Sequence, residues 1–157
     1  MTFLAIHLLL TVAWVAVTGS TEPANVALGF VVANVVLWWA RPLLGPTRYF
    51  EKLPEAVALA GVFAWELVKS NLRVARDVVA IRPTRRTGIV AVPLDAESDV
   101  EITLLANLIT LTPGTLSVDV SSDRRTLYVH AMFIDDADEV RRSIKRRFES
   151  RVVRLLR

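Results

Sequence analysis

The chain has 157 residues, of which 53% are hydrophobic and 22% charged, and its net charge at neutral pH is +3. This length fits one domain, or a small domain with an attached segment, and the lack of cysteine excludes disulfides, thiolate nucleophiles and cysteine-bound metals. In residues 1–40 the one formally charged side chain is Glu22, whereas every lysine and arginine lies at Arg41 or later. We therefore predict a membrane anchor joined to a soluble part.

Two apolar runs open the chain, at residues 3–18 and 24–40, with a polar Gly-Ser-Thr-Glu-Pro turn between them. At 1.5 Å per residue each run covers about 25 Å, slightly less than the roughly 30 Å hydrocarbon core of a bilayer. The second run leads into Trp38 to Pro42, whose indole rings suit the headgroup level and whose arginine and proline should end the span. The pattern predicts a transmembrane helical hairpin over residues 1–42.

The basic residues predict the orientation of this hairpin. The turn between the runs has none, whereas Arg41, Arg48 and Lys52 follow the second run, so the positive-inside rule places both chain ends in the cytoplasm. A cleaved signal peptide is the alternative for the first run, but that run lacks a basic n-region and a second apolar run follows at once. We expect a multi-pass protein of the cell membrane with a cytoplasmic C-terminal domain.

The third segment, residues 53–82, should contain a long helix from Leu53 to Ile81 with Pro54 in its first turn. Its uninterrupted apolar stretch, Ala56–Trp65, is too short to span a bilayer. Beyond it, apolar and charged residues alternate at helical spacing, as in an amphipathic helix. Two alternatives stay open: the helix lies on the membrane surface or against a partner, or it makes a third span.

Residues 86–157 are typical of a small soluble domain. The β-branched sequence TGIVAVPLD predicts a strand, with Pro93 at its end or on an exposed edge. Ser98 and Glu101 then match a capping box at the start of a helix. This helix should end near Thr112, because the residue before a proline is disfavoured in the helical conformation.

The sequence Thr112-Pro113-Gly114 should redirect the chain, since glycine takes positive φ without steric cost. Strands are predicted at Thr115–Val120 and Thr126–Ile134, followed by a final helix capped by Asp135 or Asp136. The apolar stripe of that helix comprises Ala137, Val140, Ile144, Phe148, Val152 and Leu155. The order β-α-β-β-α predicts a two-layer domain, so the fold class is an α+β membrane protein with a transmembrane helical hairpin and an amphipathic linker helix.

The segment EITLLANLITLTPGTLSVDV, followed by TLYVHAMFIDD, resembles the E subunit of the multisubunit Mrp/Mnh-type cation/proton antiporters. The resemblance covers the coarse layout of the whole chain. It implies an accessory subunit of a large membrane complex that exchanges sodium or another monovalent cation for protons, with the ion path carried by larger subunits. The residues that we expect to form a structural and assembly motif are Glu101, Thr112, Pro113, Gly114, Ser117, Asp119 and His130.

Three residues could take part in ion movement. His7 could titrate in a proton relay, but a neutral imidazole bonded to a backbone carbonyl near the membrane end is favoured. Glu66 and Lys69, three residues apart on one helical face, could form a cation or proton site. An ordinary surface ion pair is favoured for them.

The remaining polar residues favour structural roles. His130 has no second histidine and no cysteine nearby to complete a zinc site, so we expect it to bond across the sheet or to a partner. Asp119, Asp135 and Asp136 should serve turns and helix capping. Since no catalytic triad order, glycine-rich phosphate loop or metal-ligand cluster stands out, we expect no enzyme, no cofactor and no metal.

The arginine-rich final helix allows three interpretations: a solvated face, docking on anionic lipid or an acidic partner subunit, or nucleic-acid binding. The last would make the chain an independent membrane-tethered regulatory or RNA-binding domain. It is the weakest, because RNA-binding sheets present stacking aromatics and these strands offer mainly Tyr128 and Phe133. The expected partners are therefore the other antiporter subunits and the bilayer, with no nucleic acid.

Overall fold

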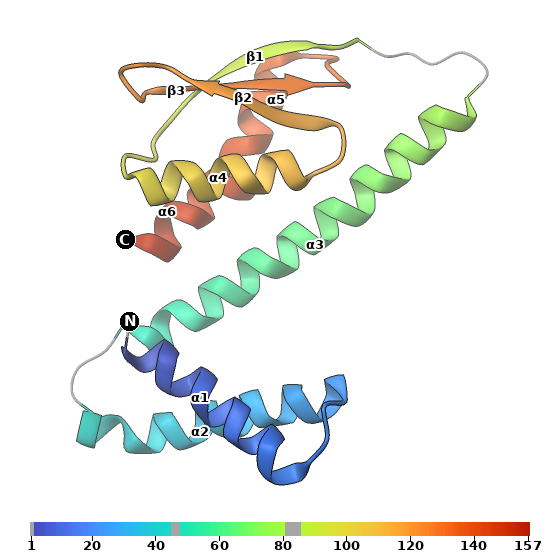
Figure 1. Ribbon diagram of the computed structural model, residues 1–157. Coiled ribbons are helices and arrows are strands. Elements are labelled where there is room, and N and C mark those ends of the chain that lie inside the picture. The colour runs from blue at the N-terminus through green and yellow to red at the C-terminus, as the bar shows by residue number, and fades with distance from the viewer. Residues whose placement is uncertain (1, 45–47, 81–85) are drawn as a thin grey trace. The chain divides into compact units, whose positions relative to one another are not determined.

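The computed structural model describes residues 2–44, 48–80 and 86–157. It divides into two compact units, residues 1–54 and 55–157, and the boundary falls inside the longest helix. The elements, in chain order, are α1 (Thr2–Thr18), α2 (Pro23–Leu44), α3 (Tyr49–Val79), β1 (Gly88–Pro93), α4 (Asp99–Leu111), β2 (Thr115–Val120), β3 (Thr126–Ala131), α5 (Ala137–Ile144), the π-helical turn η1 (Lys145–Glu149) and α6 (Ser150–Leu156) (Figure 1).

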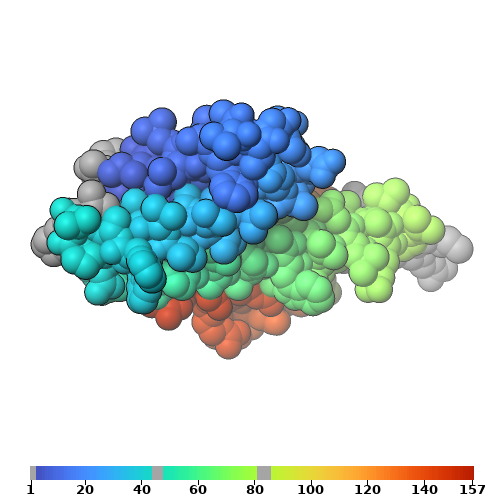
Figure 2. Space-filling view, turned by 90° about the horizontal axis from the view of Figure 1, so that it is seen from below, coloured from blue at the N-terminus to red at the C-terminus, as the bar shows by residue number. Residues whose placement is uncertain are grey.

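Helices α1 and α2 form a hairpin in the first unit, and Figure 2 shows them in contact, in dark blue and in lighter blue to cyan. Gly29 permits the close packing, because a Cβ at this position would lie 2.5 Å from Cδ1 of Trp14. Trp14 also donates a hydrogen bond of 3.1 Å from Nε1 to Oδ1 of Asn25. Within the described residues, α2 is the one helix long and apolar enough to cross a membrane, and the apolar helix over Phe3–Thr18 is shorter.

Prolines do not stop the helices where the sequence suggested. Helix α2 continues through Pro42 to Leu44, because a missing N–H in the last turn removes only one hydrogen bond. Helix α3 begins at Tyr49, four residues before the expected start, with Pro54 inside it. The carbonyl of Arg48 accepts the N–H of Lys52 at 3.0 Å, so a helical turn is already closed ahead of the proline. The expected end of this helix at Ile81 lies outside the described residues.

The second unit contains a three-stranded antiparallel sheet in the order β1-β3-β2. Strand β1 is therefore an edge strand, and Pro93 is its last residue, as predicted. Its edge is partly covered, because Nε of Arg141 donates to the carbonyl of Ala91 at 2.8 Å. On the other edge, the N–H of Ser117 donates to the hydroxyl of Thr110 at 3.1 Å. Blocked edges of this kind disfavour pairing with a further strand.

Helices α4, α5 and α6 lie on one side of this sheet (Figure 1), and the core lies between the two layers. The strand β3 ends at Ala131, three residues earlier than predicted, although the N–H of Met132 still donates to Gly114 O at 2.9 Å. The buried apolar side chains of the core include Val90, Val92, Leu105, Ile109, Leu127, Val129, Ile144, Phe148 and Val152.

The sequence predicts one regular final α-helix, but the structure differs. The π-helical turn η1 separates α5 from α6. Its apolar positions Val140, Ile144, Phe148 and Val152 recur every four residues, which is longer than the 3.6-residue period of an α-helix. A π turn accommodates the additional residue. Ile144, Phe148 and Val152 are consequently all buried.

Candidate functional site

The hinge of the domain, Thr112 to Thr115, ends α4 and begins β2. Thr112 leaves the helical conformation, with φ −83° and ψ 115°, while its hydroxyl donates to Leu108 O at 2.8 Å. Gly114 has φ +90°, which favours glycine. The hydroxyl of Thr115 donates to Ile109 O at 2.7 Å and to Thr112 O at 2.9 Å. The predicted helix end and the positive φ are both confirmed, and the two threonines tie the hinge to the last turn of α4.

A cleft of about 210 Å³ lies beside this hinge, entirely within the second unit. It is bounded by the hinge, one face of α3, the segment after β3, and α5 with η1. The ring of Phe133 lies against the hinge, since its Cε2 would be 3.4 Å from a Cβ at Gly114. The guanidinium of Arg73 stands 5.7 Å from the centre of the same ring, a cation–π geometry.

Glu66 lies at one wall of the cleft and is only 8% exposed. Nζ of Lys69 is 3.6 Å from one carboxylate oxygen, and Nη1 of Arg147 forms an ion pair with the other. The predicted ion pair of Glu66 and Lys69 is therefore present, but the prediction that it lies on the surface is wrong for Glu66. The carboxylate is buried between two cations, one on its own helix and one on η1, because the α3 face that carries Glu66 packs on the domain.

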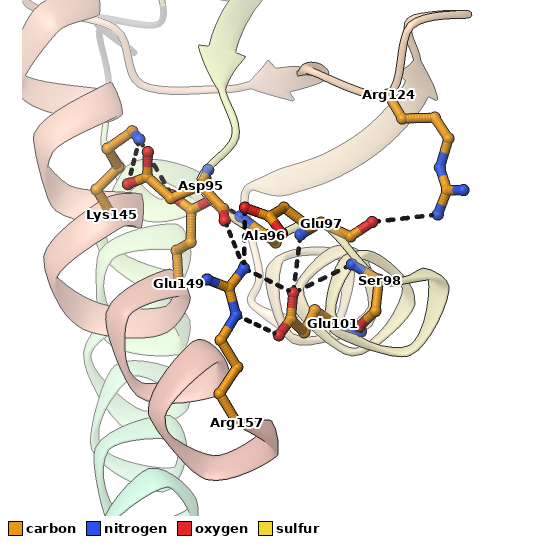
Figure 3. Close-up of polar contacts among 9 residues, drawn as sticks. All are labelled: Asp95, Ala96, Glu97, Ser98, Glu101, Arg124, Lys145, Glu149 and Arg157. Carbon is orange, nitrogen blue, oxygen red and sulfur yellow. Dashed lines mark hydrogen bonds and ion pairs between the residues drawn. The ribbon is translucent and has the colours of Figure 1, made fainter.

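A second polar cluster lies at the other end of α4, around Glu101 (Figure 3). The capping box is confirmed: Ser98 Oγ accepts the N–H of Glu101 at 3.2 Å, and Glu101 Oε2 accepts the N–H of Ser98 at 3.2 Å and that of Glu97 at 2.8 Å. Nε of Arg157 donates to Oε1 at 3.0 Å. The hydrogen bond from Arg157 and those from the backbone lower the pKa of the Glu101 carboxyl to about 2.

Glu149 of the π turn extends the same cluster (Figure 3). This side chain is almost completely buried, and its Oε1 accepts the N–H groups of Asp95 at 2.6 Å and Ala96 at 3.1 Å. Lys145 lies 3.4 Å from Oε2 of Glu149 and donates to Asp95 at 2.7 Å. The cluster joins the last helices to the loop between β1 and α4.

His7 is fully buried in the first unit. Its Nε2 lies 2.8 Å from Phe30 O, its Nδ1 contacts the hydroxyl of Tyr49, and its ring stacks on that of Phe30 at 4.1 Å between centres. A carbonyl requires a donor, so Nε2 carries a proton toward Phe30 O, and Nδ1 shares a hydrogen bond with the tyrosine hydroxyl. Both ring nitrogens are thus engaged by groups of the first unit.

The other motif residues lie on the sheet. Ser117 Oγ donates to Ala106 O of α4 at 3.0 Å, which fixes β2 against that helix. Asp119 follows a β-bulge and accepts the N–H of Val120 at 2.8 Å. His130 lies in register between Ile89 and Leu116, on the sheet face away from the helices. In the described part of the chain, its ring takes part in no hydrogen bond, so it does not bond across the sheet.

The aspartates after β3 have separate surroundings. Asp136 caps α5 by accepting the N–H of Asp138 at 2.9 Å, as predicted, and lies 3.4 Å from Arg142. Asp135 lines the hinge cleft with it. No group of three or more metal-ligating side chains occurs among the described residues.

The structure thus distributes the motif over the hinge, the sheet and the Glu101 cluster. The hinge and the Glu101 cluster lie at opposite ends of the 13-residue α4. Sequence reasoning missed the partners that complete these sites: Arg147, Arg157, Glu149 and Phe133. Three of them come from the final helical region, more than 45 residues beyond Glu101 in the sequence. Of these four residues, only Glu149 could have been suspected from the sequence, because it is an acidic residue within an otherwise basic helical segment.

A family model described as Na⁺/H⁺ ion antiporter subunit matches residues 7–155 of the chain. The E subunit of the Na⁺/H⁺ antiporter of Alkalihalophilus pseudofirmus is 33% identical over 148 residues, which cover 94% of each chain. That of Bacillus subtilis is 34% identical over 147 residues, 94% of this chain and 93% of its own. The E1 subunit of the Na⁺/H⁺ antiporter of Staphylococcus saprophyticus is 36% identical over 149 residues, 95% and 92% of the two chains.

Two solved structures contain similar chains. One belongs to the Mrp complex of a Dietzia species, with a TM-score of 0.51 and 30% identity, covering 60% of this chain and 89% of the other. The second belongs to a membrane-bound sulfane sulfur reductase, an archaeal respiratory membrane complex, with a TM-score of 0.60 over 98% of both chains. At 24% identity the second shows the likeness of fold alone.

Proposed function

The chain belongs to the family of Na⁺/H⁺ antiporter E subunits, and on that premise we propose that it is an accessory subunit of a multisubunit sodium/proton antiporter. In this role it supports the assembly and stability of the complex, while larger subunits carry the ion path. Its partners are those polytopic subunits and the bilayer.

The observation that carries this proposal is the state of the ionisable side chains in the hairpin. Residues 2–44 contain three of them, His7, Glu22 and Arg41, and Glu22 lies in the turn between the helices. A proton relay needs a group that can exchange partners across the membrane. His7 is enclosed by Phe30 and Tyr49, with both ring nitrogens engaged. This supports a structural role for His7.

The buried carboxylates of the second unit support the same conclusion. Glu66 lies between Lys69 and Arg147, Glu101 binds Arg157 and two backbone N–H groups, and Glu149 binds two further N–H groups. Of these, Glu101 has its carboxyl pKa lowered to about 2, chiefly by the hydrogen bond from Arg157, which is unfavourable for a carboxylate that must take up and release a proton near neutral pH.

For the topology we propose an in–out–in hairpin of α1 and α2 with a cytoplasmic domain. The basic residues after α2 support this orientation. For α3, packing of Leu59 and Phe63 against the domain core supports a location outside the hydrocarbon, since the same face carries the buried Glu66 ion pairs. Cysteine at Ser20 should be labelled from outside the cell, and cysteine at Ser122 only after permeabilisation; outside labelling at Ser122 contradicts this topology.

The experiment that tests the proposed function compares the isolated chain with the complex. Purified alone and reconstituted in liposomes, the chain should move neither sodium nor protons, and in mild detergent it should co-purify with several polytopic proteins. Deleting it should lower antiport in membrane vesicles in proportion to the loss of assembled complex. Sodium or proton movement by the isolated chain would overturn the proposal.

The RNA-binding alternative receives little support. Of the two aromatic residues that a binding sheet would need, Tyr128 is partly exposed on β3, but Phe133 lies beyond the end of that strand and packs at the hinge. One accessible ring is a poor stacking platform for bases.

A further inference from the structure

The sheet of the second unit has an outer face that no helix of that unit covers among the described residues (Figure 1). Alternation along the strands places Val90, Val92 and Val129 in the core, so their neighbours point away from it. The large apolar side chains exposed on the outer face are Ile89, Leu116, Val118 and Tyr128. We call these four residues the outer patch.

The polar side chains beside the outer patch include those of His130 and Asp119. The His130 ring lies between Ile89 and Leu116 and, within the described ranges, takes part in no hydrogen bond. Asp119 is opposite Tyr128 in the register, and among the described residues its side chain accepts a hydrogen bond only from the N–H of Val120. A half-buried imidazole without a partner is unfavourable unless water or a binding partner satisfies it.

We propose that the outer patch is the surface by which the domain docks on a neighbouring subunit of the antiporter complex. That partner presents apolar side chains to Ile89 and Leu116, a hydrogen-bonding group to His130 and a basic side chain to Asp119. The proposal rests on the proposed function, because it requires a complex in which the chain is a subunit.

Charge and size distinguish this occupant from two others. Within the three strands, the one formally charged side chain is that of Asp119, which is negative and lies on the edge strand β2. The arginine-rich helices lie on the opposite side of the sheet, so an anionic lipid surface is a poor match. Four partly exposed side chains offer on the order of a few hundred Å². A stable homodimer needs roughly 800 Å² per partner, but a subunit already held by its membrane hairpin needs less.

The mode of docking also follows from the sheet. A partner strand cannot extend β2 freely, because Thr110 occupies the N–H of Ser117, and Pro93 and Arg141 obstruct the edge of β1. Docking therefore uses the face of the sheet and side-chain contacts.

The test uses the whole complex in its native membrane. Because the chain lacks cysteine, Leu116→Cys introduces a unique site for a photoactivated cross-linker, and Val100→Cys on α4 is the matched control. Cross-linking to another subunit is expected from Leu116→Cys and not from Val100→Cys. Cross-links to a second copy of the chain, to lipid alone, or equally from both positions would overturn the proposal.

A second measurement uses retention of the chain in the purified complex. Ile89 and Val100 are both 64% exposed, so Ile89→Asp and Val100→Asp add the same charge at equal exposure. Ile89→Asp should lower retention severalfold, and Val100→Asp should leave it unchanged. Asp119→Asn, which keeps the size of the side chain, should weaken retention to a smaller degree. Normal retention of both Ile89→Asp and Asp119→Asn refutes the docking surface and leaves the proposed function intact, whereas a wild-type chain that never co-purifies refutes the proposed function itself.

Discussion

Arg157 and Glu101, 56 residues apart in the sequence, are joined by a hydrogen bond of 3.0 Å between Nε and Oε1 at the end of the second unit. This contact gives the domain a specific dependence on pH. A carboxyl whose pKa is lowered on folding stabilises the fold fully above its ordinary value of 4.5, and this contribution is lost as the pH falls toward about 2. The thermal stability of the full chain in detergent, followed by circular dichroism, should therefore fall over this acid range.

The variant Glu101→Gln should lose this contribution, on the order of 2 kcal/mol at neutral pH, because a charged acceptor is replaced by a neutral one. Glu97→Gln is the matched control, since Glu97 also lies near Arg157, at 3.6 Å, but is largely exposed. It should change stability by less than about 0.5 kcal/mol. Equal losses from the two variants would show that burial of Glu101 does not matter.

The Glu66–Arg147 ion pair should couple α3 to η1. In a double-mutant cycle with Glu66→Gln and Arg147→Met, we expect a coupling energy of about 1 kcal/mol, limited by the partial exposure of Arg147. The exposed pair Arg48–Glu51, whose side chains are 71% and 75% exposed, should give a value near zero. Chemical denaturation of the full chain measures both cycles. Identical coupling energies in the two would contradict the claim that the Glu66–Arg147 ion pair couples α3 to η1.

In the first unit, Tyr49→Phe should destabilise the chain by about 1 to 2 kcal/mol, because it removes the hydroxyl that satisfies Nδ1 of the buried His7. His7→Gln should destabilise it similarly, since glutamine does not reproduce both contacts. Sodium-dependent proton movement per assembled complex should stay unchanged in both variants. If transport per complex vanished in His7→Gln while assembly stayed normal, His7 would belong to the ion path.

Local rules were sufficient to predict several elements from the sequence. The capping box at Ser98 and Glu101, the helix end before Pro113 and the positive φ of Gly114 each depend on residues within a few positions of one another. The same holds for β2, whose bounds, Thr115–Val120, match the prediction. Short-range hydrogen bonds and steric limits determine such features, so they can be predicted from the neighbouring residues in the sequence.

Features that depend on tertiary packing were not predictable in this way. The π turn, Lys145–Glu149, forms because the core must contact apolar residues spaced by four. Burial of Glu66 and the reach of Arg157 to Glu101 depend on how distant segments meet. Pro54 suggested a helix start, but a turn nucleated at Arg48 overrode it. Single-sequence patterns carry no direct record of these contacts.

The hinge offers the most direct test of the claim that this chain supports assembly. Gly114→Val should cost roughly 1 to 3 kcal/mol, because a β-branched residue at φ +90° is strained and its Cβ would press toward Phe133. Pro113→Ala should cost less than about 1 kcal/mol, since the backbone path stays available.

The decisive measurement is to quantify the assembled complex and the antiport rate in the same membrane vesicles carrying Gly114→Val, with Pro113→Ala as the milder comparison. We expect complex and antiport to fall together, so that the rate per assembled complex equals that of the wild type. Normal assembly with abolished antiport would contradict the account, because the hinge would then act in ion transport itself.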